Sequence, residues 1–418
     1  MEAPACPVST SRPTKRPMRF VAPSIALLVV SLAGACTPAP TPTWPSGTVP
    51  TVTASTPTSV DVAWPAATAA SGTTIAAYEL SVDGTVKATN GATTRTAHLG
   101  GLKPKSSYQV GIRAKDSKGQ WSKPGLTVNA TTPSYAGLAS GARSVTTTFG
   151  GQTRTYYLYV PASVAANPNT PVPLVVALHG GMGSGSQLAN TSQLNPEADK
   201  HGFVVAYPDG LLLPTAKGTN VRTWNAGGCC NPAMSKGVDD VGYVASVIEA
   251  LEKATAIDAS HVVIGGHSNG AILTWRMACE RPQVMTHAVI VEGALMVPSC
   301  TPDRGVNLTQ IHGDADTFLP LAGGVGNGLS GTNFTSAAAS RAMWTTGQHC
   351  ASPSQSSGDH LTITTWADCA GGTTTKQVII AGGTHAWAGA DPANSADFLG
   401  APSPYLSATQ VFVEALLH

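Results

Sequence analysis

The chain has 418 residues, of which 42% are hydrophobic and 11% are charged, and its formal net charge is +1. This length is sufficient for two domains, and the apolar content is that of a globular protein. The near-neutral charge leaves no extended basic surface, which excludes a function that depends on binding nucleic acid.

The N-terminal segment has the pattern of an export signal. Four basic residues between positions 12 and 19 precede an apolar run at 20–35 that ends in small residues. The run is shorter than the roughly 20 residues that cross a bilayer as a helix. Its basic lead and small-residue end favour a signal peptide at 1–36 over a membrane-spanning anchor. The pattern therefore predicts an extracellular or cell-surface protein.

Cys36 directly follows this run in the sequence LAGAC and resembles the acylated cysteine of bacterial lipoproteins. The departure from that signal is Ala33, because leucine is usual three positions before the cysteine. Two interpretations stay open: attachment of a lipid anchor at Cys36, and simple cleavage with release of the protein.

Six further cysteines lie in the exported part, and an even number there suggests disulfides. They are Cys229, Cys230, Cys279, Cys300, Cys350 and Cys369. Their spacing favours the pairs Cys279–Cys300 and Cys350–Cys369, which would leave Cys229 and Cys230 as a vicinal pair. No C-x-x-C pair or histidine cluster at ligand spacing accompanies them, so we expect no metal site.

Residues 37–49 form a Pro/Thr-rich segment that we expect to be an extended, semi-rigid tether. Between 50 and 133 short alternating apolar runs are separated by turn sequences, as in a β-sandwich. Trp64 and Tyr78 are expected in its core, and Tyr108 stands where a tyrosine corner is expected. This region resembles a fibronectin type III domain. We expect it to act as a spacer, with substrate or wall binding as the alternative.

Residues 134–143 form a second linker, and the region 144–418 alternates short apolar runs with helix-like ones. Strands are expected at 155–160, 173–180, 203–210, 261–266, 286–294, 307–316 and 376–383. Helices are expected at 195–202, 237–254, 270–280, 335–346 and 407–417. Asp239 and Asp240 open one of these helices and are expected to cap it. Short all-apolar strands followed by turns predict a mostly parallel sheet with helices on both faces.

The sequence GHSNG at 266–270 is the strongest functional signal, although a five-residue pattern alone is weak evidence. It follows a predicted strand and begins a predicted helix, which is the setting of a nucleophile elbow. Such a turn exposes the hydroxyl of Ser268 in a strained backbone conformation. It requires Gly266 and Gly270 because side chains at those positions would collide.

A serine hydroxyl needs a base to remove its proton and a third group to orient that base. In proteins with this turn the acid and then the histidine follow the serine along the chain. Asp316 and His385 occur in that order, each at the end of a predicted strand. Because reactive groups gather at the carboxyl ends of such strands, we expect Ser268, Asp316 and His385 to meet. Asp314 is the alternative acid, less favoured because Asp316 lies further along the loop.

The other histidines near these motifs are interpreted as structural or surface residues. They are His267, whose ring should point away from the serine hydroxyl, His312, which should be packed and hydrogen-bonded, and His349 and His360, which should lie at the surface.

Two backbone N–H groups should bind the oxyanion that forms when a serine attacks a carbonyl group. The start of the helix after the serine directs the N–H of Asn269 toward that position. The second donor should come from the loop after the strand at 173–180, where Gly181 is favoured and Gly180 and Met182 are alternatives. No Lys-Ser/Thr pair follows these glycines, which disfavours a phosphate-binding loop.

With these residues in place, the region from 146 to 387 resembles the exported esterase family that contains polyhydroxybutyrate depolymerases and feruloyl or acetylxylan esterases (carbohydrate esterase family 1-like). The matching segments are LHGG (178–181), RTWNAGGCC (222–230), GVDDVGYV (237–244), GGHSNGA (265–271), HGDAD (312–316) and GGTHAW (382–387). The resemblance implies an α/β-hydrolase with Ser268 as nucleophile, Asp316 as acid and His385 as base, in agreement with the pattern of residues.

One departure from the family bears on the substrate. The family often has Thr-Trp-Pro-Gly after the histidine, whereas this chain has Ala-Trp-Ala-Gly at 386–389, so the rim of the site is expected to be looser. Trp224, Trp387 and His179 are candidate substrate contacts. The two indole rings either stack on an acyl or aromatic group or belong to the core.

These observations predict a serine esterase that hydrolyses carboxylic esters through an acyl-enzyme, with hydroxyalkanoate oligomers and feruloyl or acetyl esters as the substrate classes. We expect no cofactor, and a monomer that acts on a small or polymeric ester. Two alternatives stay open: a serine peptidase of related fold, and a surface adhesion protein with an inactive hydrolase domain.

Overall fold

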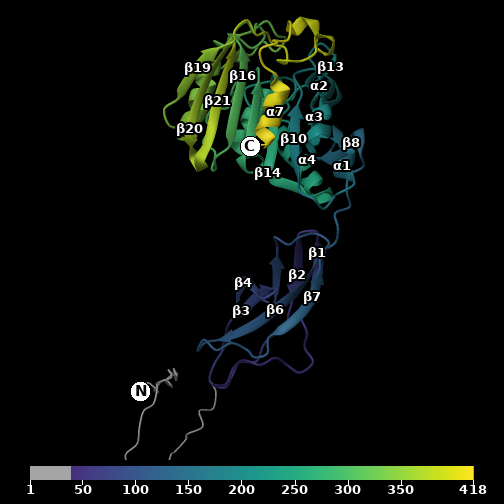
Figure 1. Cartoon of the computed structure of the whole chain (residues 1–418), viewed down its shortest axis with the longest axis vertical. Helices are drawn as coiled ribbons and strands as arrows, with labels where there is room; N and C mark the ends of the chain where they lie inside the picture. Colours follow the sequence, from purple (N-terminus) through teal and green to yellow (C-terminus); the bar gives the residue numbers. More distant parts are fainter. Residues whose placement is uncertain (1–38, 418) are drawn as a thin grey trace, which may run out of the picture.

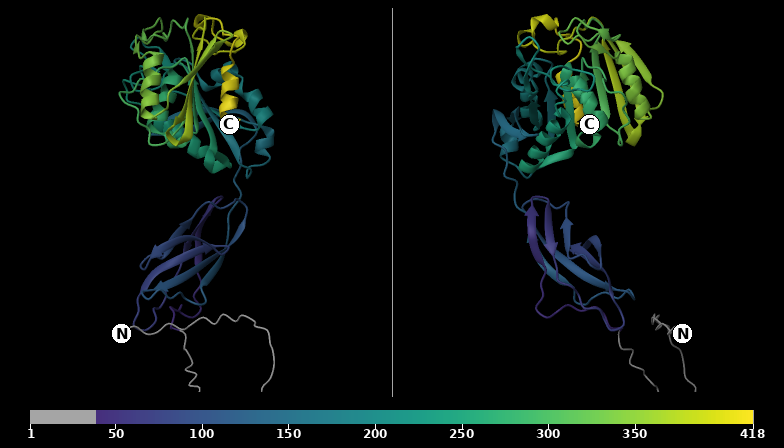
Figure 2. Two further views of the ribbon diagram at one scale, coloured as in Figure 1. Left: turned by 60° about the vertical axis from the view of Figure 1, so that its left-hand side comes forward. Right: turned by 180° about the vertical axis from the view of Figure 1, so that it is seen from behind.

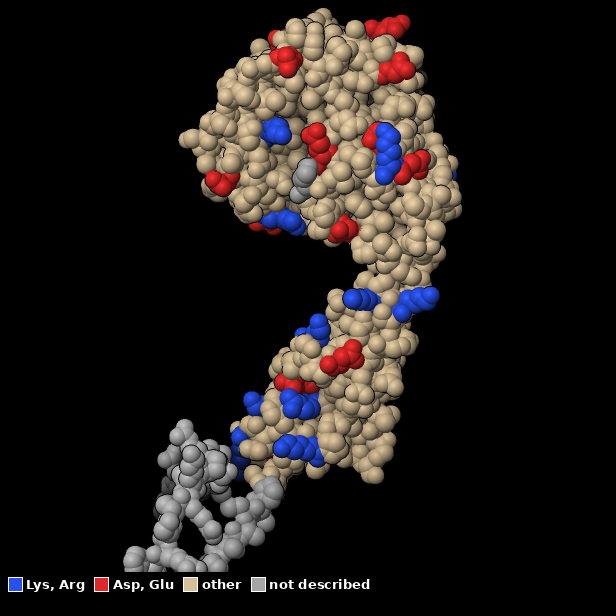
Figure 3. All heavy atoms as spheres, viewed as in Figure 1, with Lys and Arg blue, Asp and Glu red and all other residues tan. Residues whose placement is uncertain are grey.

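The computed structural model describes residues 39–417. The predicted signal peptide and Cys36 lie outside the described residues. Within 39–417, no helix combines the length and the apolar character needed to cross a membrane. The described chain forms an N-terminal β-sandwich and a larger α/β domain (Figure 1). On the face drawn in Figure 3, charged side chains are sparse over the α/β domain, in keeping with the low charged content of the sequence.

The sandwich consists of two antiparallel sheets, with strand orders β1-β2-β5 and β4-β3-β6-β7. Its strands are β1 (Thr51–Thr56), β2 (Ser59–Ala63), β3 (Ile75–Val82), β4 (Thr85–Gly91), β5 (Thr96–Leu99), β6 (Ser107–Asp116) and β7 (Leu126–Thr131). Trp64 and Tyr78 are buried between the sheets, as predicted. The Tyr108 hydroxyl accepts the Lys103 N–H at 2.7 Å, which is the backbone contact of a tyrosine corner.

The segment before the sandwich differs from the tether expected at 37–49. Thr43 pairs with Thr68 in an isolated antiparallel bridge, and the Trp44 ring lies 5.9 Å from that of Tyr78. The apolar indole therefore packs on the sandwich, and this part of the segment belongs to the folded domain. Composition alone suggested an extended chain because Pro and Thr outnumber the single aromatic residue.

The α/β domain is built on a ten-stranded sheet of order β19-β20-β21-β16-β15-β14-β10-β11-β9-β8. Its strands are β8 (Gly141–Phe149), β9 (Gln152–Val160), β10 (Val172–Leu178), β11 (Val204–Pro208), β14 (Ile257–His267), β15 (His287–Val291), β16 (Asn307–Gly313), β19 (Ser354–Gly358), β20 (Leu361–Cys369) and β21 (Thr373–Ile380). The six strands from β21 to β11 run parallel, and each edge carries an antiparallel pair. This arrangement confirms the predicted mostly parallel sheet.

Helices cover both faces of the sheet. They are α1 (Ala162–Ala165), α2 (Gly185–Ser192), α3 (Leu194–His201), α4 (Asp240–Ala254), α5 (Asn269–Glu280), α6 (Ala337–Gly347) and α7 (Ala408–Leu417). Side chains along β10 alternate between two apolar clusters, one that includes residues of α4, α5 and α6 and one that includes residues of α2, α3 and α7. Because successive side chains of a strand point to opposite faces, the two clusters lie on opposite faces. The left view of Figure 2 shows the sheet between α6 (light green) and α7 (yellow).

Several elements of this domain were not expected from the sequence. Polar segments rich in Thr and Ser, without a clear periodicity of apolar residues, form the strands β8, β19 and β20 and the helix α2. Two short antiparallel pairs also form in loops, β12 (Leu212–Pro214) with β13 (Asn220–Arg222) and β17 (Gly324–Val325) with β18 (Asn333–Phe334). The second linker ends at residue 140, because β8 begins at Gly141.

All three disulfides predicted from the spacing are present. Cys279–Cys300 links the end of α5 to the loop after β15, and Cys350–Cys369 links the loop after α6 to the end of β20. The remaining pair is the vicinal disulfide Cys229–Cys230.

The acidic pair at the start of α4 has two different roles. Asp239 is the N-cap, and its Oδ1 accepts the Gly242 N–H at 2.8 Å. Asp240 does not cap the helix, which corrects the prediction for that residue. Its Oδ1 accepts Arg154 Nη2 at 2.8 Å, its Oδ2 accepts the Asn225 N–H at 2.8 Å, and both charged side chains are buried.

We expect Asp240→Asn to lower the free energy of unfolding by about 3–5 kcal/mol, because Arg154 would keep a buried charge without its carboxylate partner. Asp239→Ala is the matched control: it removes only a helix cap, at a cost of about 1 kcal/mol. Denaturant unfolding of both variants measures the difference. Equal losses would contradict the distinction between cap and buried ion pair.

Candidate active site

Ser268 stands on a sharp turn between β14 and α5. Its backbone has φ 54° and ψ −120°, a left-handed conformation that is strained for a residue with a side chain. A Cβ on Gly266 would lie 2.6 Å from the carbonyl carbon of Gly270, and a Cβ on Gly270 would lie 2.2 Å from the Leu178 oxygen. The turn therefore requires glycine at both positions, as the collision argument predicted.

The structure brings Ser268, His385 and Asp316 together in one hydrogen-bonded row. His385 Nε2 lies 2.8 Å from Ser268 Oγ, and His385 Nδ1 lies 2.7 Å from Asp316 Oδ2. The three residues follow β14, β16 and β21, whose carboxyl ends meet at one edge of the parallel sheet. His385 and Asp316 are buried, whereas Ser268 is partly exposed. The serine can therefore meet a molecule from solvent while the groups behind it are shielded.

Asp316 is held as an anion by N–H donors. Its Oδ1 accepts the backbone N–H groups of Phe318 at 2.8 Å and Leu319 at 2.9 Å. Burial by itself raises the pKa of Asp316, but the hydrogen bond from His385, the charge of that ring and the Leu319 N–H outweigh it. The pKa therefore lies below its usual value. Asp314, the alternative acid, is exposed and accepts the Gly382 N–H at 2.7 Å instead.

The other histidines have structural or surface positions. His267 is buried, and its Nε2 lies 2.7 Å from the backbone oxygen of His385. Burial lowers the pKa of His267 to about 4, and the nearby His385 ring adds to the effect, so His267 is neutral and donates this hydrogen bond. His312 is buried and its Nε2 lies 2.8 Å from the Leu319 oxygen, whereas His349 and His360 are exposed.

The candidate oxyanion donors lie on two neighbouring segments. Asn269 is the first residue of α5, and a Cβ on Gly181 would lie 3.9 Å from the Asn269 Cβ. The Met182 N–H donates to the Arg222 oxygen at 2.7 Å, which leaves it engaged and removes it from the candidates. Gly181 and Gly180 remain, and the exposed Gly181 is the one that solvent reaches more freely.

The three candidate substrate contacts are all buried, which corrects that prediction. Trp224 donates its Nε1–H to the His179 oxygen at 2.8 Å, and Trp387 donates its own to Thr409 Oγ1 at 3.1 Å. His179 bridges two loops: Nδ1 lies 2.7 Å from the Gly180 oxygen, and Nε2 accepts the Gly210 N–H at 2.9 Å. Burial lowers the pKa of His179 to about 4. These rings hold the loops of the site in place and present no free face to a ligand.

Comparison with known proteins finds matches to both domains. Residues 154–300 match the family described as Esterase PHB depolymerase, and residues 45–128 match the fibronectin type III domain. The α/β domain is thus similar to PHB depolymerase-type esterases, and the β-sandwich is similar to fibronectin type III domains.

Feruloyl esterase B of Piromyces equi is 26% identical to the chain over 225 residues, which are 51% of this chain and 39% of that protein. Feruloyl esterase B of Neurospora crassa is 31% identical over 173 residues, which are 40% of this chain and 53% of that protein. The chain thus spans about half or less of the length of these relatives. Among solved structures, an acetyl xylan esterase from Aspergillus awamori aligns with 18% identity and a TM-score of 0.43, over 58% of this chain and 94% of that one.

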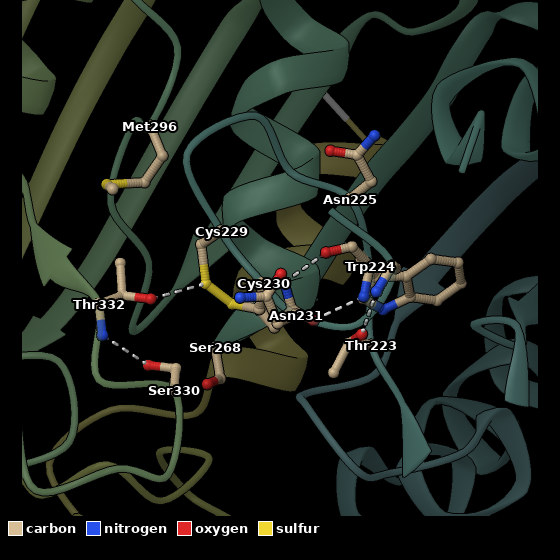
Figure 4. Close-up of a disulfide and its surroundings, with 12 residues drawn as sticks. Thr223, Trp224, Asn225, Cys229, Cys230, Asn231, Ser268, Met296, Ser330 and Thr332 are labelled. Carbon is tan, nitrogen blue, oxygen red and sulfur yellow. Dashed lines mark hydrogen bonds between the residues drawn. A yellow bond between two sulfur atoms is a disulfide. The ribbon is translucent and has the colours of Figure 1, made fainter. Parts of the chain in front are cut away.

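The vicinal disulfide of the α/β domain is tied to the serine turn through Trp224. The Trp224 oxygen accepts the Cys230 N–H at 2.9 Å and Asn269 Nδ2 at 3.2 Å, and the Trp224 N–H donates to Asn269 Oδ1 at 2.7 Å. On the other side, Thr332 Oγ1 lies 3.7 Å from Cys229 Sγ. Figure 4 shows the disulfide between these two segments, with Ser268 in the same view. The disulfide loop therefore helps to fix Asn269.

Two residues of the candidate site were missed in the sequence. The Phe318 ring stacks on the His385 imidazole at 5.2 Å with an interplanar angle of 17°. Glu292 brings a carboxylate oxygen within 4.8 Å of ligand-type atoms of Asp316 and His385. Because His385 Nδ1 is engaged with Asp316, the group forms a hydrogen-bond network rather than a metal site. Glu292 follows a predicted strand in VIVEGA, and this position at a strand end was the signal in the sequence that could have identified it.

We expect Gly270→Ala to lower the stability of the α/β domain by about 3 kcal/mol, because the added methyl group meets the rigid backbone carbonyl of Leu178. Gly358→Ala is the matched control, since a Cβ there meets nothing within 4 Å, and it should change stability by no more than about 1 kcal/mol. Thermal unfolding and soluble yield are the measurements. A G270A protein as stable as G358A would show that the turn can relax.

Proposed function

We propose that the chain is a serine esterase that hydrolyses carboxylic esters, with Ser268 as nucleophile, His385 as general base and acid, and Asp316 as the acid that orients it. The observation that carries this proposal is the continuous row Ser268–His385–Asp316 at 2.8 and 2.7 Å. This row links the partly exposed Ser268 to the base His385 and to the buried carboxylate of Asp316, as nucleophilic catalysis by serine requires.

In the proposed reaction Ser268 Oγ attacks the ester carbonyl carbon while its proton passes to His385 Nε2. The Asp316 carboxylate stabilises the imidazolium that forms, and the N–H groups of Asn269 and Gly181 hold the oxyanion. Collapse of the tetrahedral intermediate breaks the bond to the alcohol oxygen, which takes the proton from His385 and leaves. Water then attacks the acyl-enzyme by the same route, releasing the acid and restoring the hydroxyl of Ser268.

We propose hydroxyalkanoate oligomers and feruloyl or acetyl esters as the substrate classes. Support comes from the names of the matched family and relatives and from the apolar surface next to the base. Phe318 stacks on His385 and contacts Phe398, whose side chain is 64% exposed, with a centroid distance of 6.1 Å. An acyl chain or an aromatic acid can bury apolar area against these two rings.

We expect Ser268→Ala to lower kcat on these esters by at least about 10⁴-fold and to abolish labelling by an organophosphonate, because no other group can form the acyl-enzyme. Asp316→Asn should lower kcat by a similar order, since an amide orients His385 as the wrong tautomer. Ser330→Ala is the control: this serine is labelled in the same close-up as Ser268 (Figure 4) but is exposed on a loop, and its loss should leave labelling unchanged.

The assay uses short hydroxybutyrate oligomers, methyl ferulate, acetylated xylan and a peptide amide with wild-type and variant proteins. Phosphonate label that persists in S268A would overturn the assignment of the nucleophile. Turnover of the peptide without turnover of any ester would favour a peptidase, and no turnover or labelling at all would favour an inactive adhesion domain.

We further propose that the protein is exported and anchored by a lipid at Cys36, with the fibronectin type III domain as a spacer between the membrane surface and the esterase domain. Support comes from the basic and apolar N-terminal sequence and the LAGAC segment. The three disulfides agree with an oxidising compartment.

For the anchor, we expect wild-type protein to partition into the detergent phase and Cys36→Ala to move it into the aqueous phase or the medium, because the acyl chains are lost. Cys6→Ala is the matched control, since Cys6 leaves with the proposed signal peptide and its loss should change nothing. Mass spectrometry of the mature N-terminus identifies the modification. An unmodified Cys36 in the medium would refute anchoring while leaving export intact.

A further inference from the structure

Glu292 has an unusual place for a charged residue. It is the first residue after β15, the strand that lies between the strand of Ser268 and that of Asp316. Its backbone has a φ of 52°, its exposed fraction is 1%, and its N–H donates to the Ile311 oxygen at 3.0 Å. Burial of an acidic group and a left-handed backbone at a residue with a side chain each cost free energy. Such residues occur mainly at functional sites.

Among residues 39–417, no lysine or arginine forms an ion pair with the carboxyl group of Glu292. Its two oxygens accept the single Gly313 N–H, at 3.0 and 3.1 Å. His312 Nε2 lies 3.4 Å from Oε2, but it also lies 2.8 Å from the Leu319 oxygen, to which it donates. Burial lowers the pKa of His312, so this ring is neutral. The other titratable groups that face Glu292 are Asp316 and His385.

Two carboxyl groups this close in a buried site do not both ionise. Asp316 has three N–H donors, from Phe318, Leu319 and His385, whereas Glu292 has one. The charge is therefore stabilised on Asp316 and the shared proton resides on Glu292. Burial raises the pKa of Glu292 well above its ordinary value, and the charge of Asp316 and the hydrogen bond shared with it act in the same direction.

We propose that Glu292 is a positioning residue that stays protonated in the working enzyme and donates a hydrogen bond to the Asp316 carboxylate, which keeps that carboxylate aligned with His385. The proposal rests on the proposed function for its effect on catalysis, but the protonation of Glu292 is a property of the fold. A neutral Glu292 also leaves one negative charge, that of Asp316, beside His385.

The catalytic test compares Glu292→Gln with Glu292→Met. The glutamine keeps an acceptor for Gly313 and a donor for Asp316, so kcat/KM should stay within about threefold of wild type and the acid limb of its pH profile should not move. The methionine removes the donor at similar volume, so kcat should fall by at least about tenfold with KM within about twofold, because the base loses its alignment.

The stability test needs no activity. Because the folded pKa of Glu292 is raised, its contribution to stability is present below the unfolded pKa of about 4.3 and is lost as pH rises toward the folded pKa. The amide introduced by Glu292→Gln does not titrate, so the Tm of E292Q relative to wild type should rise steadily from pH 5 to pH 8. Glu249→Gln is the matched control, since its side chain is 65% exposed on α4, and its relative Tm should stay flat.

The outcomes separate the two proposals. A wild-type protein without ester turnover or phosphonate labelling refutes the proposed function, while the Tm series still reports the proton on Glu292. An active wild type with a flat Tm series for E292Q overturns the inference. So does an acid limb that moves down by about one pH unit in E292Q, because a negative charge near His385 would then have been removed.

Discussion

The parallel register of β14, β15, β16 and β21 is the constraint on which the site depends. These four strands are neighbours in the sheet, with His267 opposite Val291, Val291 opposite Ile311 and Gly313 opposite Ile380. Because parallel strands end at one edge, the residues that follow them converge although they are far apart in the chain. Apolar clusters on both faces hold this register, since a one-residue slip would exchange the two faces of a strand.

Around this edge the distribution of N–H donors decides which groups carry charge. Asp316 is placed where two loop N–H groups and the His385 ring point at it, and it gains no cation from Lys or Arg. Glu292 is equally buried but receives one backbone donor, so the same burial acts on the two acids with opposite results. Burial lowers the pKa of His267 and of His312, so both rings are neutral. They donate hydrogen bonds to backbone oxygens without competing for the proton of Ser268.

Much of the fold was predictable because its centre consists of short apolar strands, each followed within two residues by Gly, Asp or Ser. The meeting of Ser268, Asp316 and His385 was predicted from their order along the chain and their positions at strand ends, and the disulfides were predicted from the cysteine spacing. The outer antiparallel strands β8, β19 and β20 were not predictable, since a strand that is solvated on one face needs few apolar residues. The burial of Trp224 and Trp387 was left open because an indole suits a core and a ligand site equally well. Glu292 was missed because the neighbours of a single acid after a strand can be identified only once the order of the strands in the sheet is known.

The buried Trp224 holds the groups behind Ser268 in place, whereas part of the apolar surface next to His385 is exposed. Trp224 is bonded to both His179 and Asn269, so it joins the loop of Gly181 to the start of α5. The proposed oxyanion donors are thereby fixed relative to each other by the core, independent of any substrate. The Phe398 ring, which lies against Phe318, is different in kind, since it is 64% exposed on the short 3-10 helix Asp397–Leu399. In the proposed reaction a change at Phe398 can alter the acyl group that fits without disturbing the groups behind Ser268, so specificity and chemistry are separable.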